Sequence, residues 1–569
     1  MLGNQSASRR EFLAGAALAG AASVIPATLR AETGSKAIRP FMIAVPAADI
    51  QAMRQRIAGT RWADTQPAAD DGQGVRRQTL EPLMRYWADG YDWRKVEARL
   101  NALPMFLTEI DGLDIHFIHV RSRHAQALPM ILTHGWPGSI LEFLKVIDPL
   151  TNPTAHGGKA EDAFHLVIPS IPGFGFSAKP TVPGWGSDHI GRAWAMLMKR
   201  LGYDRYVSQG GDCGTVISQR MALQHVPGLL GIHLNMPAVV PADVARTLAA
   251  GDPAPASLSP KERGAFDQLE AFYRDNAAYA AMMNTRPQTI GYSLVDSPVG
   301  MAAWMYEKIA QWTHSGGQPE RVLGRDAILD DLSLYWLTAT GASAARIYWE
   351  DHSNNFNARG IIDLPVAVSV FPGEIFRAPR SWAERCYTNL FYFNEVADGG
   401  HFAAWEQPGL FADGVRAAFR PLGWPFASRR STMCDTKTLY TAQVHVTGGR
   451  EGAARSADGR LDLKLSTPGG PGQGTNPEQL FAAGWSACFE GAMAIAAKTR
   501  GISLPGDLAI DAEVALRHGE DGYSLAARLN VSVPGVEPDI ARALIEAAHR
   551  TCPYSKAIKG NIDAVVALV

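Results

Sequence analysis

The chain has 569 residues, of which 46% are hydrophobic and 19% are charged. At roughly 100–200 residues per domain, this length predicts three or four structural units, and the composition is that of a globular protein with a sizeable core. The formal net charge of -2 leaves no basic surplus to neutralise phosphates, which argues against nucleic-acid binding. The five cysteines are few and odd in number, which argues against a dense disulfide framework.

Residues 1–32 have the pattern of an export signal. Arg9 and Arg10 precede an uncharged, alanine-rich apolar run over residues 13–26. This run is too short to span a bilayer as a helix, which takes about 20 apolar residues. The arginine pair followed by Phe-Leu resembles the bacterial twin-arginine signal, which implies a bacterial source and a periplasmic location. An amphipathic or disordered leader on a cytoplasmic protein is the alternative.

Beyond the signal, the sequence predicts an α/β fold. Helical patterns over residues 46–57 and 82–100 indicate that residues 38–125 form an N-terminal helical segment. Short apolar runs that end in turn residues then alternate with helical patterns, as buried parallel strands do. These runs span residues 129–133, 165–169, 206–209 and 364–370. A long helical stretch over residues 241–345 interrupts the alternation, and we expect it to form a lid on a domain spanning residues 126–427.

The composition changes near residue 428. Residues 428–436 have the character of a linker, and they contain Met433. The segment that follows resembles the opening of an independent protein. We therefore expect a gene fusion, with a second domain over residues 437–569.

The first candidate nucleophile is Asp212, in the string Gly210-Gly211-Asp212-Cys213-Gly214 between a predicted strand and a predicted helix. The spacing of small residues is that of a nucleophile elbow, whose tight turn requires glycines. A serine in this place must lose a proton before it attacks. An aspartate, with an ordinary pKa of roughly 3.9, is already ionised and can form an ester directly.

The other parts of a hydrolase site follow in the expected order. Glu374 comes after the strand at residues 364–370 and can orient a histidine, and His401 lies further on in a glycine loop. The base is needed only when water attacks the ester. The backbone N–H groups of Trp136 and Cys213 are the candidate oxyanion donors.

Residues 38–427 resemble the microsomal-type epoxide hydrolases. The strings that match are Arg61-Trp62, His134-Gly135-Trp136-Pro137-Gly138-Ser139, Pro172-Gly173-Phe174-Gly175-Phe176-Ser177, Asp296-Ser297-Pro298-Val299-Gly300 and Gly400-His401-Phe402-Ala403-Ala404-Trp405-Glu406. The resemblance implies an α/β-hydrolase fold, hydrolysis of epoxides to diols, and two lid tyrosines that donate hydrogen bonds to the epoxide oxygen. Tyr279 and Tyr348 match these tyrosines. The chain departs from the family at Cys213, where related enzymes usually have Trp, so the choice of substrate stays open.

Three other interpretations of the first domain remain. A haloalkane dehalogenase also uses Asp, but it commonly needs a halide-binding Trp beside it, and an ester hydrolase would prefer Ser. A catalytically silent binding module is the third possibility, although the intact triad of Asp212, Glu374 and His401 argues against it.

A second constellation lies near the C-terminus. Asn476-Pro477 is a helix start signal, and the pattern that follows is apolar nearly all round, which predicts a buried helix carrying Cys488. A second cysteine, Cys552, precedes Pro553, where the preceding helix should end. A buried structural thiol is the simplest interpretation of either cysteine taken alone.

Residues 437–569 closely resemble the organic hydroperoxide resistance (Ohr) branch of the OsmC-like proteins, an α+β fold. The matching strings are Thr447-Gly448-Gly449-Arg450, Leu463-Lys464-Leu465-Ser466-Thr467-Pro468, and the segments 476–488 and 552–561. The resemblance implies that Cys488 is the peroxidatic thiolate, that Cys552 is the resolving cysteine, and that Arg450 and Glu478 are the catalytic Arg and Glu.

The resemblance also implies a homodimer through the C-terminal domain and an external thiol reductant, either a lipoylated or a dithiol protein. It predicts no bound metal or cofactor. The non-catalytic alternative is a structural disulfide in an oxidising periplasm, which would leave Arg450 and Glu478 without a purpose. Reductants of this family are typically cytoplasmic, so the predicted export signal is in tension with the predicted peroxidase.

Overall fold

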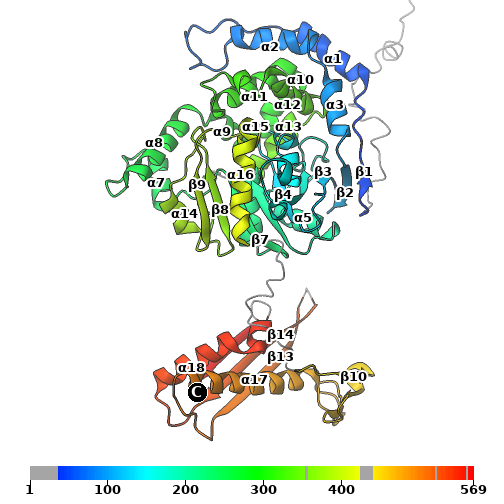
Figure 1. The fold of residues 1–569 in the computed structure, drawn as a ribbon, viewed down its shortest axis with the longest axis vertical. Helices are drawn as coiled ribbons and strands as arrows, with labels where there is room; N and C mark the ends of the chain where they lie inside the picture. Colours follow the sequence, from blue (N-terminus) through cyan, green and yellow to red (C-terminus); the bar gives the residue numbers. More distant parts are fainter. Residues whose placement is uncertain (1–35, 353–355, 423–439, 520–521, 559–561) are drawn as a thin grey trace, which may run out of the picture. The chain divides into compact units, whose positions relative to one another are not determined.

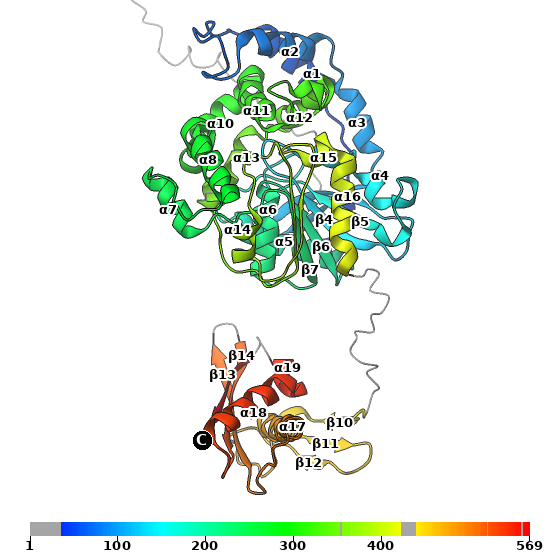
Figure 2. The ribbon, with the colours of Figure 1, turned by 60° about the vertical axis from the view of Figure 1, so that its left-hand side comes forward.

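The computed structural model describes residues 36–352, 356–422, 440–519, 522–558 and 562–569. The chain divides into two compact units, Met1–Thr432 and Met433–Val569. The predicted signal and the predicted linker, with Cys434, lie outside the described residues. Figures 1 and 2 show the elements of each unit.

The first unit is built on a nine-stranded sheet with the strand order β1-β2-β3-β5-β4-β6-β7-β8-β9. From β5 to β9 neighbouring strands are parallel, whereas β1, β2 and β3 join antiparallel at one edge. The strands are β1 Arg39–Pro40, β2 Met105–Ile110, β3 Leu113–Val120, β4 Leu128–Thr133, β5 Phe164–Pro169, β6 Tyr206–Gly210, β7 Leu229–Leu234, β8 Val366–Val370 and β9 Leu390–Glu395. Every residue of β4, β6 and β8 is buried, because helices cover both faces of the sheet.

Helix α6 packs against α5 and the central strands β4, β6 and β7, and α16 packs against α4 and β8 (Figure 2). Their bounds, with those of the shorter helices α14 and α15, are α4 Ile147–Thr151, α5 Ser187–Arg200, α6 Cys213–Leu223, α14 Arg380–Cys386, α15 Ala403–Glu406 and α16 Pro408–Phe419. This arrangement of a largely parallel sheet between helices confirms the predicted fold class.

Seven helices lie between β7 and β8, where the sequence predicts a helical insertion. They are α7 Ala242–Ala250, α8 Pro260–Asp275, α9 Ala278–Thr285, α10 Pro287–Asp296, α11 Pro298–Trp312, α12 Arg325–Leu337 and α13 Gly341–Asp351. Figure 1 shows α9 to α13 gathered at one end of the sheet. The lid therefore covers the end where β6 delivers Asp212.

The N-terminal segment differs from the predicted helical segment in two ways. The pattern over residues 82–100 forms two helices, α2 Arg77–Asp89 and α3 Trp93–Asn101, with Gly90 at the end of the first. The segment also contributes β2 and β3, a hairpin that turns at Asp111-Gly112 with positive φ at both residues. An Asp-Gly pair between apolar runs is a hairpin signal, because glycine tolerates this backbone and aspartate is one of the few other residues that adopt it.

The helices of the N-terminal segment are fastened to the lid by buried polar contacts. The indole of Trp87 donates to the Ser333 hydroxyl at 2.8 Å, and the phenol of Tyr91 donates to Asp330 at 2.8 Å. Arg99 forms an ion pair with the same carboxylate at 2.7 Å. The preceding helix α1, Ala47–Ala58, packs against α11. The segment therefore holds the lid helices in place from outside.

The second unit has two three-stranded sheets and three helices. The strands are β10 Val444–Thr447, β11 Ala453–Ser456, β12 Asp462–Lys464, β13 Ala509–Gly519, β14 Gly522–Ser532 and β15 Asp563–Leu568. The helices are α17 Pro477–Thr499, α18 Pro538–Thr551 and α19 Pro553–Ile558. The side chain of Asn476 accepts a hydrogen bond from the Gln479 N–H at 2.8 Å, so α17 begins where the sequence predicts.

The burial of α17 departs from the prediction. Among the described residues it is the one helix that is long and apolar enough to cross a membrane, yet only 28% of its apolar stretch is buried. Its buried side chains include Trp485, Phe489 and Met493, which pack against α18 and β13. In a single chain, one face of α17 meets the core and the rest of its apolar surface stays open.

Candidate active sites

Asp212 stands on a strained turn between β6 and α6. Its φ of 51° and ψ of −123° lie outside the regions that most residues adopt. A Cβ on Gly210 would overlap the backbone of Gly214, and a Cβ on Gly214 would overlap the carbonyl of Thr133. The small residues around Asp212 are therefore required by the close approach of β4, β6 and α6.

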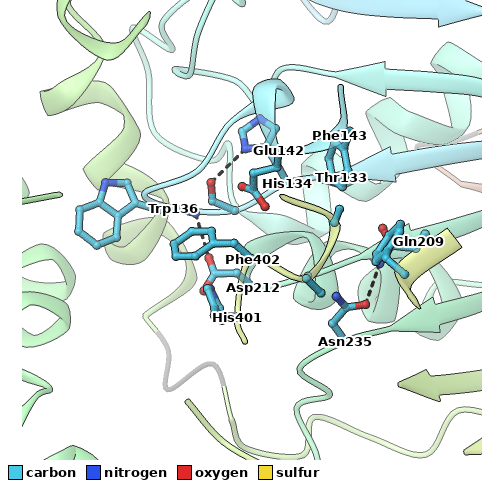
Figure 3. A pocket seen from close by; sticks show the side chains of 15 residues that line it. Thr133, His134, Trp136, Glu142, Phe143, Gln209, Asp212, Asn235, His401 and Phe402 are labelled. Atoms are coloured by element: carbon cyan, nitrogen blue, oxygen red, sulfur yellow. Dashed lines mark hydrogen bonds and ion pairs between the residues drawn. The ribbon is translucent and has the colours of Figure 1, made fainter. Parts of the chain in front are cut away.

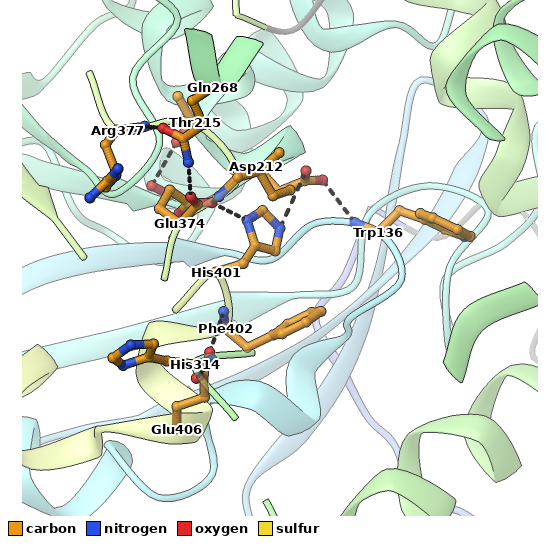
Figure 4. A network of polar contacts seen from close by, with 12 residues as sticks. Trp136, Asp212, Thr215, Gln268, His314, Glu374, Arg377, His401, Phe402 and Glu406 are labelled. Carbon is orange, nitrogen blue, oxygen red and sulfur yellow. Dashed lines mark hydrogen bonds and ion pairs between the residues drawn. The ribbon is translucent and has the colours of Figure 1, made fainter. Parts of the chain in front are cut away.

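The predicted triad is assembled beneath the lid (Figure 4). His401 Nδ1 lies 2.6 Å from Glu374 Oε1, and His401 Nε2 lies 3.5 Å from Asp212 Oδ2. All three side chains are buried. The loop that carries His401 is held by Glu406, whose carboxylate accepts hydrogen bonds from the N–H groups of Phe402 and His314.

The charges of the triad support one another. Burial lowers the pKa of His401, but the carboxylates of Glu374 and Asp212 outweigh it and hold that pKa well above its ordinary value. Burial raises the pKa of Asp212, but hydrogen bonds and charge from His401 and the Trp136 N–H keep it below its ordinary value. The resting site is therefore an aspartate beside an imidazolium.

The two candidate oxyanion residues flank the nucleophile. The backbone N–H of Trp136 donates to Asp212 Oδ1 at 3.0 Å, and Cys213 is the first residue of α6. The Cys213 thiol is buried against Asp212, and both burial and the Asp212 charge raise its pKa well above the ordinary value. The Cys213 side chain is therefore a neutral thiol beside the nucleophile.

Tyr279 on α9 and Tyr348 on α13 meet over the nucleophile. Their ring centroids are 6.0 Å apart, and the ring of Trp136 stacks on Tyr279 at 5.3 Å. Both rings are buried, and burial raises the pKa of each phenol well above its ordinary value. The Tyr348 hydroxyl makes no hydrogen bond of good geometry to the described residues, although it interacts with the phenol of Tyr279. Both phenols stay protonated and can donate.

Asp212 and the two tyrosines line one cavity of about 210 Å³. The rest of its wall is mostly apolar and includes Met236, Phe272, Tyr273, Phe356 and Ile375. Such a cavity accepts a small apolar molecule and presents it to one carboxylate and two phenols.

The structure brings the two cysteines of the second unit together but keeps the other two predicted residues apart from them. Cys488 Sγ and Cys552 Sγ are 3.3 Å apart as free thiols. Arg450 pairs with Glu478 through two contacts of 2.7 and 3.0 Å. Glu478 and Cys488 are ten residues apart on α17, which is about 15 Å along a helix. Burial raises the pKa of Cys488, opposed by a hydrogen bond from the Tyr554 backbone.

Sequence reasoning missed one residue at the first site. Glu142, on the turn after β4, lies beside Asp212 and His401 in a second, water-sized cavity of about 20 Å³ (Figure 3). Its only sequence signal is the string Ser139-Ile140-Leu141-Glu142, which is typical of a helix cap. Ser139 does cap this turn, by accepting from the Leu141 N–H. Among the described residues, no group of three His, Cys, Asp or Glu side chains could hold a metal ion.

The first unit is an α/β-hydrolase whose elbow carries an aspartate. Family models match residues 129–312 as alpha/beta hydrolase fold, residues 38–143 as epoxide hydrolase N terminus and residues 470–566 as OsmC-like protein. A protein from Stigmatella aurantiaca that has been assigned the name epoxide hydrolase is 53% identical to this chain over 385 residues. The match covers 68% of this chain and 85% of the relative. The chain belongs to the epoxide hydrolase family, and its C-terminal unit is OsmC-like.

Two solved structures are similar to parts of the chain. The juvenile hormone epoxide hydrolase of the silkworm Bombyx mori is 29% identical with a TM-score of 0.62, over 70% of this chain and 98% of that one. An organic hydroperoxide resistance protein OsmC from Legionella pneumophila is 43% identical with a TM-score of 0.22, over 23% of this chain and 98% of that one. The first match covers the hydrolase part of the chain.

Proposed function

We propose that the first unit hydrolyses epoxides to diols through an ester on Asp212. A carboxylate oxygen attacks one ring carbon, the bond between that carbon and the ring oxygen breaks, and the oxygen takes up a proton. Tyr279 and Tyr348 donate hydrogen bonds to the oxygen while its negative charge develops. The observation that carries this proposal is that one cavity is lined by a buried carboxylate and two protonated phenols.

The second step is hydrolysis of the ester with His401 as the base. In the resting site, the Asp212 charge raises the His401 pKa. Formation of the ester removes that charge, so the His401 pKa falls. The imidazolium then gives up a proton, which replaces the one taken up by the epoxide oxygen, and the neutral imidazole can accept a proton from water. Water oxygen bonds to the ester carbon, the diol leaves, and the carboxylate returns. Attack thus prepares the base that the next step needs.

The intact mass of the full chain tests this proposal after mixing with styrene oxide. His401→Gln should gain the mass of one epoxide and hold it, because attack needs no base but hydrolysis does. Asp212→Ala should gain nothing and should keep its peroxidase activity, which serves as the control for folding. A folded His401→Gln chain that shows no adduct, or that turns over at the wild-type rate, would overturn the assignment.

The alternatives predict other outcomes in the same assay. A dehalogenase would form the adduct from a haloalkane and release halide. A silent binding module would form no adduct from either. The pair of phenols favours an epoxide as the substrate. The ring oxygen of an epoxide becomes an alkoxide and needs hydrogen-bond donors, whereas a departing halide ion does not need two phenols.

We propose that the second unit reduces organic hydroperoxides to alcohols. The Cys488 thiolate attacks the O–O bond, which gives an alcohol and a sulfenic acid at Cys488, and Cys552 condenses with it to a disulfide and water. A lipoylated or dithiol protein then returns both thiols. The separation of 3.3 Å between the two sulfur atoms supports this pairing.

The peroxidase site is proposed to form between two copies of the chain. Arg450 is paired with Glu478, which stands ten residues before Cys488 on α17, and the open apolar surface of α17 offers a surface for a second copy. Co-expression of Arg450→Ala and Cys488→Ser chains tests this. If Arg450 acts across the interface, the mixed dimer contains one intact site and regains activity, whereas sites within single chains would leave it inactive.

We further propose export through the twin-arginine signal, with a reductant in the periplasm. Replacement of both arginines, Arg9→Lys and Arg10→Lys, should move the chain from the periplasmic to the cytoplasmic fraction of a bacterial host. An unchanged distribution would favour a cytoplasmic enzyme that uses the cytoplasmic lipoylated proteins.

A further inference from the structure

A second, smaller space lies beside the nucleophile. Its volume of about 20 Å³ is enough for one water molecule, whose centre needs roughly 10–15 Å³. Asp212 lines both this space and the 210 Å³ cavity, so the two adjoin at this residue. His401 and Glu142 also line the small space (Figure 3).

The walls of this space offer the partners that a water needs. The Gln209 amide donates to Asn235 at 3.1 Å, but its Oε1 is buried and has no hydrogen-bond partner among the described residues. His401 also lines this space, and its Nε2 lies 3.5 Å from Asp212 Oδ2. A water here can donate a hydrogen bond to Gln209 Oε1 and lie beside the imidazole that must accept a proton from it.

Glu142 is a further polar residue in the wall of this space, and its surroundings favour the neutral carboxyl. Burial raises its pKa well above the ordinary value, and the neighbouring Asp331 raises it further. Asp331 is itself buried, with a pKa raised to about 8, and accepts a hydrogen bond from Ser139 at 2.6 Å. The carboxyl occupies room that Gly138 leaves free, because a Cβ on that glycine would overlap it. A neutral carboxyl can both donate to a water oxygen and accept from a water.

We infer that this space holds the water that hydrolyses the Asp212 ester, and that Glu142 is the residue that positions it. The water oxygen bonds to the ester carbon, and one water proton passes to His401 Nε2. The bond from the ester carbon to the alkyl oxygen then breaks, and that oxygen takes the proton from His401 and leaves with the diol. The inference rests on the ester mechanism proposed above.

Glu142 should therefore affect one half-reaction only. A water molecule that is held next to the ester carbon reacts faster than one that must diffuse in from bulk solvent, because its position is already fixed. Loss of that constraint slows hydrolysis and leaves attack on the epoxide untouched. In steady state kcat and KM then fall by the same factor and kcat/KM stays constant, because kcat/KM contains only the ester-forming step.

The test is a rapid-quench experiment on the full chain with excess styrene oxide, in which the mass of the protein reports the ester. Glu142→Ala should form the ester within about twofold of the wild-type rate and should hydrolyse it at least about tenfold more slowly. Glu142→Gln keeps a donor and an acceptor, so it should slow hydrolysis less and guards against misfolding of the alanine variant. Leu144→Ala, a half-buried residue of the same turn, is the matched control and should change neither rate selectively.

Each outcome decides the question. Wild-type hydrolysis in both Glu142 variants would overturn the water site, as would an equal slowing of both half-reactions with a lowered Tm. If the ester mechanism itself were wrong, the result would differ: His401→Gln would accumulate no adduct, with or without a substitution of Glu142.

Discussion

Tyr348→Phe should slow ester formation without weakening the fold. The substitution removes only the hydroxyl, since the ring is buried and packs edge-on against Trp136 and Tyr279 at 6.1 and 6.0 Å. In the resting structure that hydroxyl makes no hydrogen bond of good geometry and interacts only weakly with the Tyr279 phenol. Its loss should therefore leave the Tm of the variant nearly unchanged.

Tyr348→Phe should slow ester formation because it removes a hydrogen bond to the alkoxide that forms as the epoxide opens. A hydrogen bond to a charged group contributes about 1.5–3 kcal/mol, and about 2 kcal/mol corresponds to roughly a 30-fold slower step. The assay is the rate of adduct formation in a His401→Gln background, where hydrolysis does not interfere. Tyr335→Phe is the control, because that phenol is equally buried and donates to the Gly138 carbonyl at 2.8 Å. It should lower the Tm and leave ester formation within about twofold.

Two results would refute the reasoning. Ester formation at the parental rate in Tyr348→Phe would mean that this phenol does not touch the epoxide oxygen. A slower rate that comes with a lowered Tm would mean that the hydroxyl serves packing and not the transition state.

Further predictions concern the fold and the second site. Burial lowers the pKa of His233 to about 3, so the unfolded chain binds a proton at this residue near pH 6.5 and the folded chain does so only near pH 3. The free energy of unfolding of the first unit, measured by chemical denaturation, should therefore decrease as the pH is lowered from about 6.5 to about 3. His233→Gln should make this slope shallower by about 1.4 kcal/mol per pH unit. An identical slope in both chains would contradict this. Gly214→Ala should yield no folded hydrolase, because the new Cβ overlaps a carbonyl of β4, whereas Gly264→Ala, in open space on α8, should be neutral or should raise stability by about 0.5–1 kcal/mol. Cys552→Ser should complete one turnover and then react with a sulfenic-acid reagent at Cys488; labelling at Cys552 in a Cys488→Ser chain would reverse the two roles.

The triad of the hydrolase site could be predicted from the sequence because its residues follow apolar runs that are typical of buried strands. Asp212 is enclosed by glycines after a strand, and the space around it explains why those glycines are there. Glu374 and His401 follow later strand ends in the expected order. The tyrosines were different, because Tyr279 and Tyr348 stand on ordinary lid helices and only a family resemblance singled them out.

Other features depend on three-dimensional contacts that no local pattern contains. Glu142 stands in a string that predicts a helix cap, and only the fold of the turn after β4 turns its carboxyl towards Asp212. The hairpin β2–β3 had its Asp111-Gly112 signal, but the helical patterns that precede it led to the prediction of a helical segment over residues 38–125. The partial burial of α17 could not be predicted either, because an apolar helix has the same sequence whether its own chain or a second copy covers it.

The buried thiol beside the nucleophile has a consequence for how the two halves of the chain withstand oxidants. Peroxides react with thiolates, and Cys213 and Cys386 are both enclosed, with pKa values raised by burial. Cys488, by contrast, is only partly buried and adjoins a partner sulfur. Among the four cysteines of the described residues, oxidation should therefore reach Cys488 first, and the proposed peroxidase cycle would regenerate it. Such a hydrolase would keep working through an oxidative burst that repeatedly consumes and restores the thiols attached to it.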